Sequence, residues 1–379
     1  MRKYIKKTNV LIVGAGLSGL HTACTLHKRG IEFQLVEARN RLGGRILSET
    51  PTALDNVKTK AAFDLGPSWF WPHQLRMQSL LKNLQLTQYV FEQTELGNGL
   101  YEDQNGNIHH GITEASMRGS YRIKGGIQKI ITELTRQLPA NTCRTQSTVK
   151  EISLQNKLLV TRIETSTESQ EISSDFVVLA LPPRLAVSSI KFNPDFSSSR
   201  AMQLNNIATW MAGHAKVALH YARPFWNQRG FSGDVISQRG PLQEIHDASS
   251  PQGSGYGLIG FFGLAAQARL EKQAELNTAV IAQLVRLFGE AAALPLNVYI
   301  KDWAFDQYTA TIDDQQQLLF HPSSSLDIFV EPDWDNRLIW SGTETAVFGE
   351  RNNGYLEGAL EASERTIETL MSRLETGTS

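Results

Sequence analysis

Three glycines near the N-terminus have a spacing that could hold a pyrophosphate. The segment VLIVGAGLSGLHTACTLHKRG places Gly14, Gly16 and Gly19 between an apolar run and a stretch whose apolar residues have helical spacing. In a strand–turn–helix unit, the first glycine permits the tight turn, the second lets the backbone approach the phosphates, and the third lets helix and strand pack closely. The helix N-terminus then offers unpaired N–H groups to the anion. The motif therefore predicts a dinucleotide site.

A carboxylate and a basic turn follow the glycines. The next apolar run, IEFQLVEA, ends in Glu37, where a carboxylate can bond the adenosine ribose hydroxyls and would repel a 2′-phosphate. The segment EARNRLGGR then places Arg39 and Arg45 around a Gly-Gly turn, where arginines can make charge-assisted bonds to a pyrophosphate. We interpret Arg41 as an exposed member of this loop. NADP is disfavoured, but the glycine motif by itself does not separate NAD from FAD.

Sequence blocks spread over nearly the whole chain resemble the flavin amine oxidase branch of the glutathione-reductase-like FAD enzymes. EARNRLGGR is similar to that superfamily's second fingerprint, and FDLGPSWFWP at 63–72 is similar to the family segment that follows it. YRIKGGIQKIITELTRQL at 121–138, KDWAFDQY at 301–308 and the run 337–374 are similar to later blocks, in family order. Monoamine and polyamine oxidases are the most closely matching members. The resemblance implies FAD as the cofactor.

The resemblance also implies where the chain would hold FAD. Residues 147–185 resemble the family's β-meander, in which the backbone at the position of Val149 holds the adenine. Glu344 would meet the ribityl chain, and a helix beginning near Gly354 would direct its positive N-terminus at the pyrimidine end of the isoalloxazine, where reduction leaves negative charge. The residues assigned to the cofactor are Gly14, Gly16, Gly19, Glu37, Ala38, Arg39, Gly44, Arg45, Gly66, Pro67, Ser68, Trp69, Val149, Gly342, Glu344, Gly354, Tyr355 and Leu356.

One lysine stands in a segment that otherwise predicts a half-buried strand. In AKVALHYARPFW, 215–226, alternation places Val217, Leu219 and Tyr221 on one face and Lys216 on the other. Lysine alone indicates a solvated side chain. The resemblance changes this expectation, because the family's lysine at this position bonds flavin N5 through a water. We therefore expect Lys216 on the cavity side as a catalytic residue, with Tyr355 and Trp303 shaping the amine site.

The chain departs from the family pattern at the position of its covalent cysteine. Monoamine oxidases attach the flavin through a cysteine shortly after the Trp segment, and the counted position here is Ile312. The two cysteines of the chain, Cys24 and Cys143, lie elsewhere. We therefore predict non-covalent FAD.

A second departure concerns the aromatic pair that flanks the amine in the family. One member aligns with Tyr355, whereas the other falls at Asp313 in an ungapped count. Two alternatives stay open: a carboxylate that attracts a cationic substrate, or an exposed loop carrying Asp313 and Asp314. Trp303 and Tyr308 could still supply an aromatic wall. The interval between DLGPSW and RIKGG is also shorter than in monoamine oxidases, which predicts a trimmed substrate domain.

The elements expected around these residues form an α/β protein of two domains, as the chain length also suggests. We predict a discontinuous Rossmann-like FAD-binding domain of the glutathione-reductase type over 1–70, 119–205 and 306–379, with a β-meander. A smaller α+β substrate domain would take 71–118 and 206–305. Apolar residues between Leu356 and Leu374 predict a C-terminal helix that buries one face. Residues 268–290 predict a single amphipathic helix.

The composition and charge of the chain exclude several classes of binding partner. A formal net charge of −1 gives no electrostatic reason to expect nucleic acid or an anionic membrane, and no apolar run is long enough to span a bilayer. Two cysteines without a CxxC support neither a disulfide framework nor a zinc site. His73, His109 and His110 lack metal-ligand spacing and are expected at the surface. We expect a cytoplasmic protein without a membrane anchor or a metal.

The resemblance implies an oxidase that takes a hydride equivalent from the α-carbon of an amine to flavin N5. The imine would be released, and O₂ would be reduced to hydrogen peroxide. A second hypothesis keeps FAD but makes the chain a desaturase or oxidase of an apolar or porphyrin-like substrate. A third is a non-catalytic binding protein on the same scaffold, as Rab GDP-dissociation inhibitors are. The first hypothesis therefore implies a small-molecule substrate, an amine.

Overall fold

The described residues form two large sheets with helices around them. The computed structural model describes residues 5–51, 61–94, 96–111, 116–253, 255–316, 318, 321–322, 329, 333–347 and 352–376. The strands are β1 (Ile5–Val13), β2 (Phe33–Val36), β3 (Ser48–Glu49), β4 (Phe63–Asp64), β5 (Val90–Glu92), β6 (Asn98–Glu102), β7 (Ile108–Gly111), β8 (Tyr121–Ile123), β9 (Cys143–Arg144), β10 (Thr148–Gln155), β11 (Leu158–Glu164), β12 (Ser169–Leu179), β13 (Lys191–Asn193), β14 (Ala215–Tyr221), β15 (Phe231–Ser237), β16 (Leu242–Asp247), β17 (Tyr256–Phe262), β18 (Asn297–Asp302) and β19 (Leu338–Trp340). The α-helices are α1 (Leu17–Lys28), α2 (Leu75–Asn83), α3 (Gln128–Arg136), α4 (Pro183–Ser189), α5 (Ser198–Asn205), α6 (Phe225–Gln228), α7 (Ala266–Glu271), α8 (Leu276–Phe288) and α9 (Leu356–Thr376).

The first sheet has the order β13–β10–β11–β12–β1–β2–β9, with β19 paired to β12. Strands β12, β1, β2 and β9 run parallel, and β10, β11 and β12 form an antiparallel meander. Successive residues of β1 point to opposite faces, so Val10 and Ile12 enter one core and Leu11 and Val13 enter another. Helices α1, α3 and α9 cover the first of these faces. The predicted α/β class with a β-meander is confirmed.

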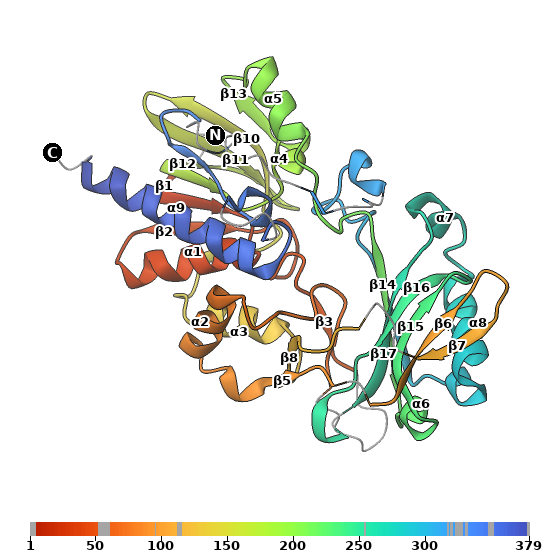
Figure 1. The fold of residues 1–379 in the computed structure, drawn as a ribbon. Coiled ribbons are helices and arrows are strands. Elements are labelled where there is room, and N and C mark those ends of the chain that lie inside the picture. Colours follow the sequence, from red (N-terminus) through yellow and green to blue (C-terminus); the bar gives the residue numbers. More distant parts are fainter. Residues whose placement is uncertain are drawn as a thin grey trace.

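Helix α9 brings the C-terminal part of the chain against the glycine-rich helix α1, and the two lie side by side in Figure 1. Leu356, Leu360, Ile367 and Leu370 are buried, as their spacing predicts. The contact also contains small polar groups, with Thr22 Oγ1 2.7 Å from Ser363 Oγ. Short side chains at this contact let the two helices approach closely.

The second sheet lies on the other side of the molecule in Figure 1 and has the order β18–β14–β17–β16–β15–β6–β7. It is largely antiparallel, with β15 and β6 as a parallel pair. Helix α8 packs its Val280, Leu284, Leu287 and Phe288 into the core on one face. The other face turns toward the first sheet through a smaller core that includes Phe63.

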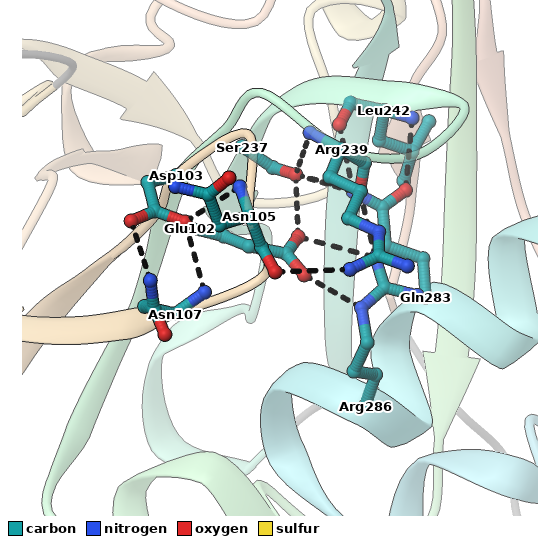
Figure 2. Close-up of polar contacts among 9 residues, drawn as sticks. All are labelled: Glu102, Asp103, Asn105, Asn107, Ser237, Arg239, Leu242, Gln283 and Arg286. Carbon is teal, nitrogen blue, oxygen red and sulfur yellow. Dashed lines mark hydrogen bonds and ion pairs between the residues drawn. The ribbon is translucent and has the colours of Figure 1, made fainter.

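A buried acidic side chain attaches helix α8 to this sheet. Glu102 at the end of β6 accepts bonds from Arg286 Nε at 2.6 Å and Ser237 Oγ at 2.6 Å, as Figure 2 shows. Gln283, one turn before Arg286, bonds both backbone groups of Leu242. Helix, sheet edge and loop are therefore joined by bonds that satisfy a fully buried carboxylate.

Strand β14 differs from its prediction. All seven residues are buried, so the expected half-buried strand is wrong. The strand lies between β17 and β18, and both of its faces are covered: Val217 and Leu219 enter the helix-covered core, and Ala218 enters the core that faces the first sheet. Alternation placed the residues on the right faces but could not show that the second face is covered.

Two other parts of the chain differ from the predicted helices and domain boundaries. Residues 268–290 form two helices, α7 and α8, with a break before Leu276, and Gly289 (φ 87°) follows α8. Helix α2 lies in the interval 71–118 that we assign to the substrate domain, yet Met77 packs in the core of the first sheet. The domain boundaries therefore stay a proposal. Within the described residues, no helix is long and apolar enough to cross a membrane.

Candidate active site

A cavity of about 770 Å³ runs between the two sheets. Its walls come from the glycine turn, the basic turn, the 65–71 segment, strand β14, the Trp303 segment and the start of α9. Every residue that we predicted for the cofactor or the chemistry lines it, except Gly19 and Glu344. The fold thus brings together residues that lie more than three hundred positions apart in the chain, such as Gly14 and Tyr355.

The three glycines have distinct surroundings. Gly14 has φ +100°, and a Cβ there would lie 2.6 Å from the carbonyl oxygen of Ala180, so only glycine fits the turn. A Cβ on Gly19 would lie 2.0 Å from the Gly14 oxygen, so Gly19 is required for close packing of the helix against the turn, behind the cavity wall. Gly16 has no atom within 4 Å of such a Cβ, which leaves room for a ligand to approach the backbone.

Glu37 braces this turn from β2. Its carboxylate accepts the backbone N–H of Ala15 at 2.9 Å and that of Arg39 at 2.8 Å. Each oxygen keeps a further lone pair, so these bonds leave acceptor capacity for a ligand hydroxyl. The carboxylate therefore shapes the loop as well as facing the cavity.

The three arginines of the basic turn have separate partners. Arg39 forms an ion pair with Asp306 and bonds Thr309 Oγ1 at 2.8 Å. Arg41 donates to the backbone oxygens of Gly44 and Ile46 at 2.8 and 3.1 Å and is half-buried, so its expected exposure is wrong. It holds the Gly-Gly turn in shape because its fork spans two carbonyls.

Arg45 forms an ion pair with Glu344, a buried carboxylate with unusual surroundings. Its Nη1 lies 2.6 Å from Glu344 Oε1. Glu344 is 0% exposed, and within the described residues neither of its oxygens accepts a hydrogen bond of proper geometry. Burying an ionised carboxylate without hydrogen bonds is costly. A buried acid whose oxygens accept no hydrogen bond from the described residues, together with the open space at Gly16, fits a cofactor that brings hydroxyl groups, as FAD does.

Lys216 lies across the cavity from this turn on β14. Its ammonium donates to Ser68 Oγ at 2.6 Å and to the Gly66 oxygen at 3.0 Å. It also lies 5.2 Å from the ring centroid of Trp69 and 5.1 Å from that of Phe261. Burial lowers the pKa of Lys216 to about 7, although the Asp64 carboxylate acts to raise it. A lysine with a pKa near 7 gains or loses its proton, and with it its charge, near neutral pH.

Aromatic rings from four segments gather at the start of α9. The Tyr355 ring meets the edge of Trp71 at 6.0 Å and stacks on His321 at 5.5 Å, and His321 in turn lies 4.9 Å from Trp210. Trp303 comes from a fifth segment of the cavity wall, where it donates its Nε1–H to the Leu65 oxygen at 2.9 Å. We did not predict Trp71 or Trp210. Trp71 stands within the 63–72 block, whereas nothing in the sequence pattern distinguishes Trp210.

The loop at 312–315 answers the question raised by Asp313. Asp313 is exposed and does not line the cavity, whereas Asp314 is buried and pairs with Arg184 at 2.6 Å. The first acid therefore follows the exposed-loop alternative, and the second is a structural anchor. Ile312, at the counted position of the family cysteine, is 80% exposed.

Comparison with known proteins agrees with this geometry. Residues 108–367 match the family model for flavin-containing amine oxidoreductases, and residues 12–84 match that of NAD(P)-binding Rossmann-like domains. The chain belongs to the flavin-containing amine oxidoreductases. Its family implies a flavin cofactor, and the Rossmann-like match agrees with the predicted FAD-binding fold.

Relatives of this amine oxidoreductase include flavin-containing amine oxidase B from Homo sapiens, which is 23% identical in an alignment that covers 96% of this chain and 86% of the relative. A solved structure of wild-type putrescine oxidase bound to putrescine has a TM-score of 0.77 at 19% identity, covering 98% of this chain and all of that one. Cyclohexylamine oxidase from Brevibacterium oxydans has a TM-score of 0.78 at 18% identity, covering 97% and 99%. These structures show the same fold.

The remaining candidates of this amine oxidoreductase lie away from the cavity. Cys24 is buried in α1 with its Sγ 3.2 Å from the Leu134 oxygen, and Cys143 is half-buried in β9. His73, His109 and His110 are exposed. Among the residues described, no group of three or more His, Cys, Asp or Glu side chains is arranged to hold a metal ion.

Proposed function

We propose that this chain oxidises an amine to an imine with non-covalently held FAD and passes the electrons to O₂, which leaves as hydrogen peroxide. The observation that carries the proposal is the single cavity shared by a dinucleotide turn, a buried lysine and an aromatic wall. A binding protein without catalysis would have no need of Lys216, whose burial costs free energy. Amine oxidation also agrees with the family.

The residues that would hold FAD follow from their surroundings. The Gly14–Gly19 turn and the N-terminus of α1 suit the pyrophosphate, Glu37 suits the adenosine ribose, and Glu344 with Arg45 suits the ribityl hydroxyls. The backbone at Val149 borders the adenine end of the cavity. When bound, FAD supplies hydride acceptance from the amine and electron transfer to O₂.

The chain's own residues would orient the reactants. Tyr355, Trp71, Trp210 and Trp303 form an apolar, electron-rich wall that favours a neutral amine held beside its π-faces. Lys216, fixed by Ser68 and the Gly66 oxygen, places a positive charge where O₂ acquires negative charge, and it would also hold a water there. No nucleophile or acid–base pair is required for this chemistry.

Non-covalent attachment is proposed from the positions of the cysteines. Neither Cys24 nor Cys143 lines the cavity. A thioether to the flavin would need a cysteine sulfur at the cavity wall. The cytoplasmic location and the absence of nucleic-acid partners stay predictions.

The first test is optical, followed by a substrate screen. Purified protein should be yellow and release its flavin completely on acid precipitation. A peroxide-coupled screen over primary amines, polyamines and amino acids should then find turnover. Colourless protein that takes up no FAD would refute the proposal. Silence across all amines, together with flavin bleaching by an unsaturated or porphyrinogen substrate, would favour the desaturase hypothesis.

A further inference from the structure

A histidine in the cavity wall has a ring nitrogen without a hydrogen-bond partner. His214 immediately precedes β14 and lines the cavity. Its backbone oxygen accepts the N–H of Trp303 at 3.0 Å, so the strand pairing extends to His214, and alternation places it on the same face as Lys216. Its Nδ1 is enclosed and has no hydrogen-bond partner among the described residues. Nε2 is therefore the ring nitrogen that can meet a ligand.

The His214 ring is uncharged near neutral pH. Burial lowers the pKa of His214 below its usual value, and the positive charge of Arg269 acts in the same direction. Glu244 on β16 acts to raise the pKa, but with the smallest effect of the three. A neutral imidazole offers either a donor or an acceptor at Nε2, according to its tautomer. The ring therefore suits an uncharged polar group.

A buried arginine holds the strand end next to His214. Arg269 of α7 bonds both carboxylate oxygens of Asp302, at 2.7 and 2.8 Å. The same guanidinium donates to the Gly213 oxygen at 2.9 Å and to the Leu264 oxygen at 2.5 Å. These bonds join the residues before β14 to the residues after β17. The position of the His214 ring is therefore fixed by the sheet.

The neighbouring strand has a glycine beside His214. Lys216 of β14 is opposite Phe261 of β17, so the same register places His214 opposite Gly263. A Cβ on Gly263 would lie 3.0 Å from Gln243 Cβ and 3.3 Å from Gln243 Oε1. Gln243 is exposed and lines the cavity, as His214 does. Two polar side chains thus border the cavity with only the Gly263 backbone between them, and we call them the His214–Gln243 subsite.

This subsite lies on the substrate side of the cavity. Strands β14, β16 and β17 belong to the second sheet, whereas the dinucleotide turn follows β1 of the first sheet. Along β14, His214 is two residues from Lys216, or about 7 Å. The His214 ring lies 6.3 Å from that of Trp210 in the aromatic wall. A substrate with its amine at this wall can therefore reach the subsite with its other end.

We propose that His214 and Gln243 bind a hydroxyl group of the substrate, so that the chain prefers amino alcohols to alkylamines of equal length. The inference rests on the proposed amine oxidation and names the class of amine. A hydroxyl both donates and accepts, so it can bond the imidazole in either tautomer and the Gln243 amide as well. A methyl group in the same place would displace water and leave both side chains without hydrogen bonds, which is unfavourable.

The test compares 5-amino-1-pentanol with n-hexylamine, which has the same number of non-hydrogen atoms. In His214→Val, the ratio of kcat/KM for the amino alcohol to that for the alkylamine should fall about tenfold, the effect of losing one hydrogen bond. His214→Gln carries an amide near the place of Nε2 and should keep the ratio within about threefold of wild type.

The second member of the subsite has a matched control. Gln243→Leu should lower the same ratio about 3- to 10-fold. Gln273→Leu changes an exposed glutamine that does not line the cavity and should keep the wild-type ratio. Because Gln243 is exposed, its substitution tests the subsite even where His214→Val does not fold. An unchanged ratio in Gln243→Leu would refute the subsite.

Calorimetry separates failure of this inference from failure of the proposed function. Binding of 5-amino-1-pentanol to the oxidised holoprotein should be about tenfold weaker in His214→Val, whether or not turnover follows. If amines reduce the flavin but both substrates respond equally to the substitutions, the subsite is refuted and amine oxidation stands. If no amine reduces the flavin and the amino alcohol binds equally to wild type and variants, both proposals fall.

A contact between His214 and the cofactor would give a different result. Fluorescence titration of the apoprotein should give the same FAD dissociation constant for wild type, His214→Val and Gln243→Leu. A higher dissociation constant in His214→Val, with an equal loss of kcat/KM for both substrates, would assign the ring to FAD and overturn the subsite.

Discussion

Glu102 and Glu344 are both fully buried acids, yet their surroundings are opposite. Glu102 accepts bonds from Arg286 and Ser237, and although burial tends to raise its pKa, these partners hold the pKa of Glu102 below its usual value. Glu344 has an ion pair with Arg45 but no hydrogen bond within the described residues. The first acid has the partners that folding requires, whereas the second is left with unused acceptors beside a cavity.

The difference distinguishes structural from functional burial of charge. A satisfied carboxylate contributes to stability through its partners, and removing one of them is costly. An unsatisfied carboxylate lowers stability and is retained where a ligand supplies the missing bonds. Lys216 is a buried charge at the cavity that does have hydrogen-bond partners, Ser68 and the Gly66 oxygen, yet burial still lowers its pKa to about 7. We therefore expect substitutions in the Glu102 region to change folding and those at the cavity to change function.

Glu102→Ala should have the largest effect. It leaves Arg286 without its buried partner and Ser237 without an acceptor, so the free energy of unfolding should fall by about 3 kcal/mol. Urea denaturation of the variant and of the exposed control Glu92→Ala measures this loss. Turnover per bound flavin should equal that of wild type. A large fall in turnover per flavin would contradict the structural role of Glu102.

Lys216→Met should give the next largest effect, on function instead of stability. Flavin should stay bound, and the second-order rate constant for reoxidation by O₂ should fall about 100-fold, equivalent to about 2.7 kcal/mol. Removing a buried amine should leave the free energy of unfolding equal to or above that of wild type. Stopped-flow mixing of the reduced enzyme with oxygenated buffer measures the rate constant. An unchanged rate constant for reoxidation would show that Lys216 does not act in the reaction with O₂.

Glu344→Gln should lower FAD affinity about tenfold, because an amide replaces a charged acceptor of the ligand's hydroxyls. The apoprotein should lose little stability, since the carboxylate that is removed accepts no hydrogen bond from the part of the chain that the structure describes, and its ion-pair partner Arg45, 28% exposed, can be hydrated instead. Fluorescence titration of apoprotein with FAD gives the dissociation constant. Glu102→Gln is the crossed control, with lower stability and normal FAD affinity. A marked loss of stability in the Glu344→Gln apoprotein would contradict the distinction between a structural Glu102 and a ligand-binding Glu344.

The pH dependence of reoxidation should show the smallest effect, about tenfold across the titration of Lys216. Its charge is lost as pH rises through about 7, so the rate constant should fall over that range in wild type and stay flat in Lys216→Met. The folded state also binds fewer protons than the unfolded state between about pH 7 and the ordinary lysine pKa of about 10.4. Lys216 therefore makes stability rise with pH in that window, and the methionine variant should lack this rise.

Local motifs were enough to predict much of the nucleotide-binding half. The positive φ of Gly14 belongs to the turn itself, and the close contact at Gly19 is with Gly14, so the spacing of these glycines carries the local geometry. The helical spacing of Leu356, Leu360 and Leu370 likewise predicted the buried face of α9. The assignment to FAD and to amine chemistry came from the family resemblance, since the local glycine motif does not show whether the dinucleotide carries a nicotinamide or a flavin.

Features that depend on packing were missed or misjudged. The exposure predicted for Arg41 and the half-buried strand around Lys216 were wrong because burial depends on what covers a face, and spacing along one segment does not contain that information. Trp210 joined the aromatic wall with no pattern to indicate it.

The sequence by itself determined the dinucleotide turn, the parallel and meander elements, and the residues available for chemistry, because short-range sterics and periodicity act within one segment. Only the tertiary structure decided the partners of those residues. It placed Arg45 beside Glu344 and joined Asp234 to Glu244 through His246, because these contacts form between strands and loops whose distance in the chain is closed by the packing of the two sheets. Charge compensation in the interior is a property of the assembled fold.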